Sequence, residues 1–253
     1  MTSAEHFDRW YAERVESPAA DELVWRMLGL PPGLQSTSLL GGAGLDEVVA
    51  ILDPRPGQVL LDLACGRGGY GLEIAGRTGC RLIGVDFSAV AISQAKRRAD
   101  ADFRVGTMTA TGLSPASVDA VLVVDAIQFA EPTLDALREC LRVLRPGGRL
   151  VLTTWEALDP ADERLPARMR QLDLASQLPE AGFVDVEVTE KPDWQAIEKR
   201  FWLESLALDA GDDLAIQSMQ DEARRVLAAS DGRRRVLARA VAPLPDEESS
   251  QPG

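Results

Sequence analysis

From residue 58 onward, short apolar runs alternate with segments in which apolar residues recur every three or four positions. The runs are typical of buried strands, and the periodic segments are typical of amphipathic helices. The pattern predicts strands in QVLLDLA, RLIGVDF, DFRVG, SVDAVLVVDA and RLVLTTW. Helices are expected between them at 69–77, 88–99 and 132–144, with Ser88 as the N-cap of the second. Alternation of this kind forms βαβ units, so we expect a parallel sheet covered on both faces.

The flanking segments follow other patterns. Before the alternating region, helices are expected at 4–14, 20–29 and 44–52, with a loop rich in Pro, Gly and Ser after the second. After Trp155, a helix is expected over 166–180, a strand over 183–190 and at least two helices over 193–229. RRVLARAVA is expected as the last strand, although its Ala, Leu and Arg residues also suit a helix.

These elements predict five regions. They are a helical lid or substrate region at 1–50, an α/β core at 51–191, a helical cap inserted at 192–230, the last core strand at 231–243 and a disordered tail at 244–253.

Composition narrows the class of protein. No run of about 18 apolar residues occurs, so we expect no membrane-spanning helix. The first residues, MTSAEHFDRWYAER, are charged and lack the order of a secretory signal. Three scattered cysteines, Cys65, Cys80 and Cys140, form neither a disulfide framework nor a metal-ligand spacing. We therefore expect a cytoplasmic protein with no metal and no membrane partner.

The formal net charge of -13 disfavours nucleic acid as a partner, because nucleic-acid binders usually present a basic surface to phosphates. Arginines are concentrated only at Arg233–Arg235, which we interpret as a solvated helix end or the entry to a strand.

The stretch GRGGYG, Gly66–Gly71, raises the question of a nucleotide ligand. Glycines between a strand and a helix let a ligand approach the backbone N–H groups. Dinucleotide-binding folds use the same device. However, Asp62 precedes the glycines, and its carboxylate would repel a diphosphate and attract an ammonium or sulfonium. Asp86 ends the next strand, where an acid can accept hydrogen bonds from ribose hydroxyls. This contact would suit a dinucleotide and a cationic, adenosine-bearing ligand equally.

Taken together, LLDLACGRGGYG, LIGVDFS, FRVGTM, VDAVLVVDAIQF, LRPGGRLVLTTWE and LPEAGFVDVEV resemble the class I S-adenosylmethionine-dependent methyltransferases. More narrowly, the chain is similar to the small-molecule enzymes of bacterial secondary metabolism and of quinone methylation. The resemblance covers residues 58–190 and implies a Rossmann-like, seven-stranded, mostly parallel α/β sheet with the strand order 3-2-1-4-5-7-6.

The resemblance also implies a cofactor site. Asp62 and the backbone of Ala64–Gly68 would hold the methionine end of S-adenosylmethionine, and Phe87 would lie against the adenine. Thr107 stands where the family commonly has an acid, which puts a side-chain contact there in doubt. The expected cofactor contacts are Asp62, Ala64, Cys65, Gly66, Gly68, Asp86, Phe87, Ser88, Thr107, Met108, Asp125 and Gln128.

For catalysis, the first candidate is His6, the only histidine, in a lid helix. Asp125, at the end of the fourth strand, and Glu156, at the end of the fifth, are the remaining acid/base candidates. His6 could equally be an ordinary surface residue. Asp125 could stay ionised near the sulfonium and move no proton. The expected acceptor contacts are Tyr11, Gln128, Trp155, Trp194 and Trp202. The tryptophans could also simply pack the cap on the sheet.

The acceptor is expected to be a small organic molecule. Oxygen is the first expectation for the atom that is methylated, and nitrogen or carbon is the next. Enzymes that methylate exocyclic amines of bases share a Pro-Pro-aromatic run after the fourth strand, and DAIQF lacks the prolines. Two alternatives stay open: a dinucleotide-dependent oxidoreductase, and a cofactor-binding protein of this fold without catalysis. The chain is expected to be a monomer or a homodimer.

Overall fold

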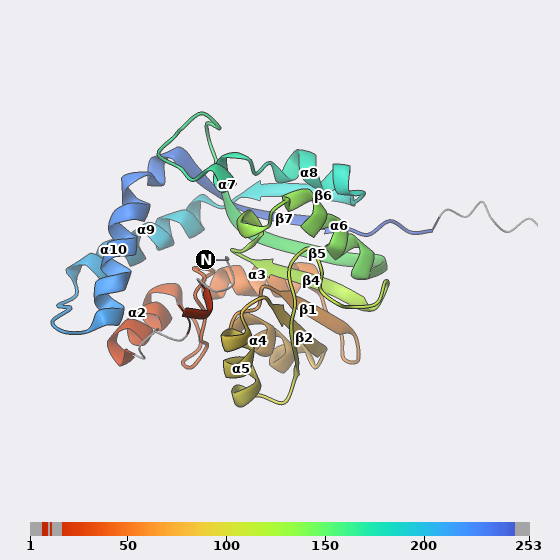
Figure 1. The fold of residues 1–253 in the computed structure, drawn as a ribbon, viewed down its shortest axis with the longest axis horizontal. Helices are drawn as coiled ribbons and strands as arrows, with labels where there is room; N and C mark the ends of the chain where they lie inside the picture. The colour runs from red at the N-terminus through yellow and green to blue at the C-terminus, as the bar shows by residue number, and fades with distance from the viewer. Residues whose placement is uncertain (1–6, 10, 12–16, 246–253) are drawn as a thin grey trace, which may run out of the picture.

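The sheet of the computed structural model has seven strands in the order β3-β2-β1-β4-β5-β7-β6 (Figure 1). The structure describes residues 7–9, 11 and 17–245. The strands are β1 (Val59–Leu63), β2 (Arg81–Asp86), β3 (Asp102–Val105), β4 (Val118–Val124), β5 (Leu144–Ala157), β6 (Val184–Glu190) and β7 (Arg233–Val241). The strands from β3 to β5 pair in parallel, and β7 is antiparallel to both β5 and β6. The predicted fold class and strand order are confirmed.

Helices cover both faces of the sheet. They are α2 (Pro18–Leu28), α3 (Gly42–Leu52), α4 (Gly69–Thr78), α5 (Ala89–Arg98), α6 (Thr133–Val143), α7 (Ala167–Arg170), α8 (Leu174–Ala181), α9 (Pro192–Ala207) and α10 (Leu214–Ala228), with 3₁₀ turns at Ile127–Phe129 and Ser230–Gly232. One core lies between the sheet and α6 and α8, and the other between the sheet and α3, α4, α5 and α9. The alternation of strands and helices thus buries the sheet on both sides, as expected.

The cap is formed by α9 and α10, which contact each other and α2 at one end of the molecule (Figure 1). The last strand, β7, returns from this cap into the sheet. Because β7 runs antiparallel to β5, its first residues lie at the carboxyl ends of the parallel strands, where Trp155 pairs with Arg235. The topology therefore brings the start of β7 to the edge at which parallel α/β sheets bind ligands.

Three expectations need correction. The helix expected at 166–180 is two helices, because Asp173 caps a new helix by accepting a hydrogen bond from Ser176 N. The fifth strand begins at Leu144, ahead of the expected Arg149, and its pairing with β4 is irregular across the intervening turn, where Gly147 has a φ of 75°. Pro132 is the N-cap of α6 and lies outside its first turn.

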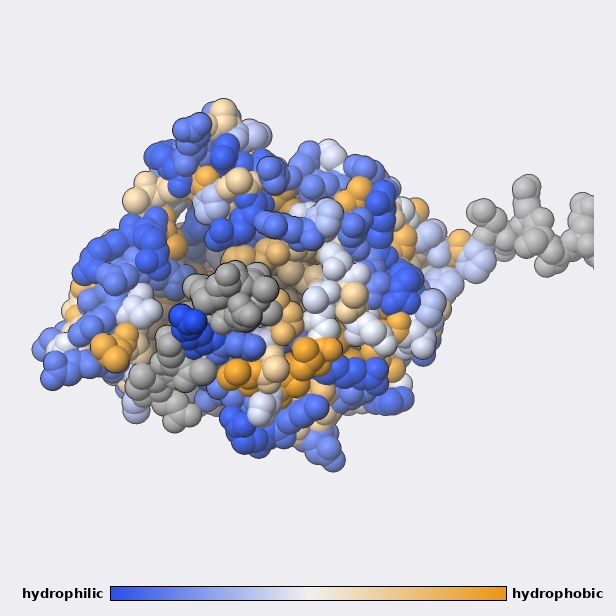
Figure 2. All heavy atoms as spheres, viewed as in Figure 1, coloured by the Kyte–Doolittle hydropathy of each residue, from blue (hydrophilic) through white to orange (hydrophobic). Residues whose placement is uncertain are grey.

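Other expectations are confirmed or lie outside the described residues. Ser88 caps α5 by accepting from Ala91 N, and the segment expected as the last strand forms β7, Arg233–Val241, and not a helix. Most of the tail lies beyond residue 245 and is not described. No described helix is long and apolar enough to cross a membrane. Hydrophilic side chains cover most of the face in Figure 2, where apolar areas are small and separate.

Candidate cofactor and acceptor site

The loop between β1 and α4 turns sharply at the carboxyl end of the sheet. Ala64 and Gly66 have φ values of 60° and 54°, in the left-handed region that favours glycine. A Cβ on Gly66 would lie 2.6 Å from the hydroxyl oxygen of Tyr11, so the missing side chain lets the N-terminal helix approach the loop. The sequence motif therefore forms a close backbone approach, as the glycine pattern predicted.

Asp62 and Asp86 form a buried acidic pair beside this loop. They are 3% and 4% exposed. Asp62 accepts a hydrogen bond from Gly71 N at 3.1 Å, and Asp86 accepts from Gly66 N and Ser88 N, each at 2.8 Å. No described Lys or Arg forms an ion pair with either acid. The backbone donors offset only part of the cost of burying two negative charges.

The pKa values of both acids reflect this burial. Desolvation, together with the charge of Asp86, raises the pKa of Asp62 to about 7, although the bond from Gly71 N acts in the opposite direction. Desolvation also raises the pKa of Asp86, against the bonds from Ser88 and Gly66. A ligand that brings a positive charge to this edge would stabilise the ionised pair.

The described part of the N-terminal helix covers this edge. Asp8 accepts hydrogen bonds from Ser88 Oγ at 2.5 Å and from Val90 N at 3.2 Å, at the start of α5. The ring of Phe7 lies 5.2 Å from that of Phe87, between centroids. Tyr11 is 6% exposed, and burial raises the pKa of its phenol. Sequence reasoning placed Tyr11 near the acceptor, and in the structure it lies directly against the glycine loop.

The free space at this edge is small. A cavity of about 20 Å³ lies among the loop 35–38, Asp62, Ala64–Arg67 and Tyr70, which is room for about one water. A nucleoside-sized ligand does not fit this cavity as it stands, so binding there requires its lining, which includes the loop 35–38, to move. His6, the expected base, lies outside the described residues.

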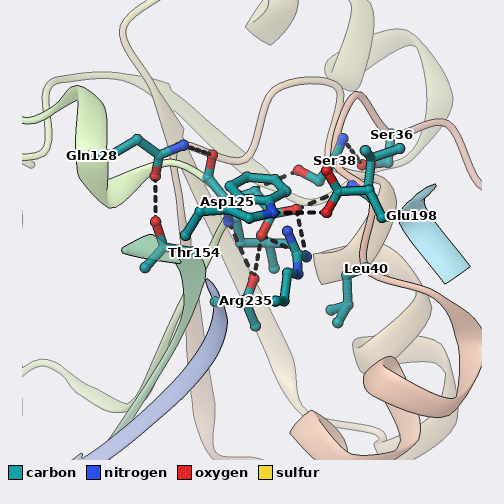
Figure 3. Close-up of polar contacts among 12 residues, drawn as sticks. Ser36, Ser38, Leu40, Asp125, Gln128, Thr154, Glu198 and Arg235 are labelled. Atoms are coloured by element: carbon teal, nitrogen blue, oxygen red, sulfur yellow. Dashed lines mark hydrogen bonds and ion pairs between the residues drawn. The ribbon is translucent and has the colours of Figure 1, made fainter. Parts of the chain in front are cut away.

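A second pair of buried acids consists of Asp125, which follows β4, and Glu198 of α9, and each forms an ion pair with an arginine of β7. Nη2 of Arg235 lies 2.8–2.9 Å from the two carboxylate oxygens of Asp125, which also accept from Thr153 Oγ1 at 2.7 Å and Leu39 N at 3.1 Å. Figure 3 shows Asp125 and Arg235 between the loop of Ser36 and Ser38 and the start of β7. These donors hold the carboxylate in a fixed position.

Arg235 is unusual because it is 1% exposed and incompletely bonded. Its Nε and Nη1 have no hydrogen-bond partner among the described residues, and its guanidinium carbon lies 4.0 Å from the centroid of the Trp155 ring. The interpretation of Arg233–Arg235 as solvated is therefore wrong for Arg235 and for Arg233, which is 9% exposed. They enter a strand, but alternate residues point into the molecule.

Glu198 of α9 is the other acid of this pair. It accepts from the indole nitrogens of Trp155 at 2.7 Å and Trp202 at 3.3 Å, and it pairs with Arg233. Trp155 and Trp202, expected together at the acceptor site, thus meet at one carboxylate. Trp194 does not share this carboxylate. Its ring packs beside Gly44 of α3 and under the ammonium of Lys191, so it joins α9 to α3.

The remaining expected residues surround the two clusters. Gln128 is 4% exposed and uses both ends of its amide, donating to Asp125 O and accepting from Thr154 Oγ1 at 2.8 Å each (Figure 3). Thr107 is exposed and lies 3.2 Å from Thr109 Oγ1, whereas Met108 packs on the core. Burial raises the pKa of the Cys65 thiol, which faces the backbone of its own loop.

Sequence reasoning missed Asp8, Glu198 and Arg235. Asp8 and Glu198 lie in helices whose polar residues resemble any solvated face. Arg235 had a readable signal, because residues of alternating direction in an expected strand place Arg233 and Arg235 on one face and Arg234 on the other.

Comparison with known proteins identifies the domain. Residues 61–152 match the family model of a methyltransferase domain. Over 105 residues the chain is 38% identical to a demethylmenaquinone methyltransferase of Beutenbergia cavernae, covering 41% of this chain and 43% of that protein. It is 34% identical over 127 residues to a malonyl-[acyl-carrier protein] O-methyltransferase of Enterobacter lignolyticus, covering 50% of each. The chain thus spans about half or less of the length of these curated relatives.

A solved structure matches almost the whole chain. Phosphoethanolamine N-methyltransferase 2 of Haemonchus contortus, in complex with S-adenosyl-L-methionine, superposes with a TM-score of 0.75 at 22% identity, over 96% of this chain and 60% of that one. At this identity the match concerns the fold. Together these findings confirm the resemblance to the class I S-adenosylmethionine-dependent methyltransferases, which the family match supports over residues 61–152.

Proposed function

We propose that the protein binds S-adenosylmethionine at the carboxyl ends of β1 and β2 and transfers its methyl group to a small organic acceptor. The buried pair of Asp62 and Asp86, without a basic partner among the described residues, carries this proposal. An ammonium or sulfonium would offset their charge, whereas the diphosphate of a nicotinamide dinucleotide would add to it. The matched methyltransferase domain supports the same cofactor.

The residues at this edge fit that cofactor. Asp62 would hold the amino group, Asp86 would accept from the ribose hydroxyls, and Phe87 would contact the adenine, with Ser88, Thr107 and Met108 around it. When bound, S-adenosylmethionine supplies a methyl group that its sulfonium already activates. The chain's own contribution is then alignment and the exclusion of water. Phe7, Asp8 and Tyr11 would supply that exclusion from the N-terminal helix.

The acceptor would approach from the cap. Trp155 and Trp202 meet Glu198 of α9 on that side, and Gln128 bonds the backbone of Asp125. By their names, the relatives above act on demethylmenaquinone, malonyl-[acyl-carrier protein] and phosphoethanolamine. We infer a natural-product or quinone-like acceptor. Oxygen is the preferred candidate for the atom that is methylated, ahead of nitrogen and carbon. Because Arg235, Thr153 and Leu39 all donate hydrogen bonds to Asp125, its proposed role is to fix position, and His6 stays the candidate base.

Calorimetric titration tests the cofactor assignment. The full chain is titrated with S-adenosylhomocysteine and, separately, with NAD⁺ and NADH. The proposal expects binding of S-adenosylhomocysteine alone, and binding of either nicotinamide would favour the oxidoreductase instead. Transfer of labelled methyl groups to small-molecule extracts then tests catalysis. Binding without transfer to any extract would favour the non-catalytic alternative.

A further inference from the structure

A second cavity lies in the cap, apart from the cofactor edge. It has a volume of about 180 Å³ and lies between α9, the end of α10 and the start of β7. One face of α9, from Gln195 to Trp202, forms one wall, and Val226 and Leu227 of α10 contribute apolar surface opposite. A dry cavity of about 150 Å³ can hold benzene, so the volume suffices for a single ring with a small substituent.

The lining of this cavity carries two acids, Glu198 and Asp231, and two bases, Lys199 and Arg233. Glu198 is occupied, because it accepts from two indoles and pairs with Arg233. Asp231, at the rim, pairs with Arg164 at 3.1 Å. Lys199 has no ion-pair partner among the described residues and lines the cavity one residue from Glu198. The lining therefore combines an apolar, ring-sized wall with one base, Lys199, that has no ion-pair partner among the described residues.

Trp155 connects the cavity to the rest of the site. Its indole nitrogen donates to Glu198 in the cavity wall, and its ring contacts Arg235, the partner of Asp125. The guanidinium carbon of Arg233, which lines the cavity, lies 5.1 Å from the centroid of the same ring. The cavity shares no lining residue with the small cavity at the cofactor edge, so a ligand held there would not occupy that edge.

We propose that this cavity binds a small carboxylic acid with an apolar body about the size of one ring. The carboxylate lies at Lys199, near Arg233, and the body lies against Trp202, Val226 and Leu227. Ion pairing selects the acid over its amide, and the limited volume selects one ring over two. The inference goes beyond methyl transfer, since it concerns a separate ligand site in the cap.

Benzoate is the test ligand, and benzamide is its neutral counterpart. Ligand-observed NMR and calorimetry on the full chain should show millimolar binding of benzoate and much weaker binding of benzamide. Lys199→Gln should weaken benzoate binding about tenfold, because one charge-assisted contact is lost. Lys96→Gln, a change at an exposed lysine of α5, should leave the affinity unchanged.

A second variant tests the cavity independently of charge. Leu227→Phe adds volume to the apolar wall and should weaken benzoate binding while S-adenosylhomocysteine still binds. Equal benzoate affinity in the wild type, Lys199→Gln and Leu227→Phe would overturn the proposal, as would no benzoate binding to the wild type. Failure to bind S-adenosylhomocysteine would instead overturn the proposed cofactor.

Discussion

Two pairs of buried acids lie near the carboxyl ends of the parallel strands, and they differ in their partners. One pair, Asp125 and Glu198, is bound by arginines, and the other, Asp62 and Asp86, is not. Asp125 and Glu198 each meet an arginine of β7 and further donors. Asp62 and Asp86 meet backbone N–H groups and no described basic side chain. The first pair is complete within the protein, so its role is to hold β7, the loop 36–40 and the cap together. The second is incomplete, so it is suited to a cationic ligand.

The largest effect is expected from removing Arg235, the ion-pair partner of Asp125. Arg235→Met would leave Asp125 buried without its cation, and the free energy of unfolding should fall by about 3–5 kcal/mol. Urea unfolding measures this change. Adding Asp125→Asn should restore part of the loss, because the uncompensated charge is then removed. If Arg235→Met alone were as stable as the wild type, the ion pair between Arg235 and Asp125 would not contribute to stability.

At the incomplete pair, the same kind of change should act in the opposite direction on stability. Asp62→Asn removes a buried charge, so at pH 8 the free energy of unfolding should stay equal or rise by about 1–3 kcal/mol. Affinity for S-adenosylhomocysteine should fall about 10- to 100-fold, because the contact to its ammonium is weakened. Calorimetry and urea unfolding measure both quantities. Asp102→Asn, a change in an exposed pair with Arg104, is the matched control.

The stability of the protein and its affinity for S-adenosylhomocysteine should depend on pH through Asp62, a member of the incomplete pair. Because the pKa of Asp62 is raised from 3.8 to about 7, the folded state binds more protons than the unfolded state between these values. The free energy of unfolding should therefore fall as pH rises from 4 to 7, by at most about 1.4 kcal/mol per pH unit from this group. Affinity for S-adenosylhomocysteine should rise between pH 6 and 8. Asp62→Asn should flatten both profiles, and unchanged profiles in that variant would assign them to another group.

The smallest effect is expected at the surface. Arg104 and Asp102 form an ion pair at 2.6 Å, but their side chains are 46% and 44% exposed. Arg104→Ala should change the free energy of unfolding by about 0–1 kcal/mol, because water screens the pair. A loss as large as that of Arg235→Met would mean that burial does not explain the contrast.

The sequence predicts the incomplete pair better than the complete one. Asp62 and Asp86 each end an apolar strand, and parallel strands bring such ends to one edge. Arg235 and Asp125 are 110 residues apart, and nothing local indicates that they meet. The fold followed from periodicity and from the resemblance. The packing of Tyr11 on Gly66 and of Trp194 beside Gly44 could not be predicted, because it depends on how distant segments approach one another.

The most direct test of the central claim is the titration of Asp62 itself, followed by NMR of its ¹³C-labelled carboxyl group. In the protein without ligand, the account predicts a pKa near the value of about 7 that burial imposes. Saturation with S-adenosylhomocysteine should lower that pKa, because the ligand's ammonium stabilises the carboxylate. A carboxyl group that titrates near 4 without ligand, or whose pKa does not respond to the ligand, would contradict the account.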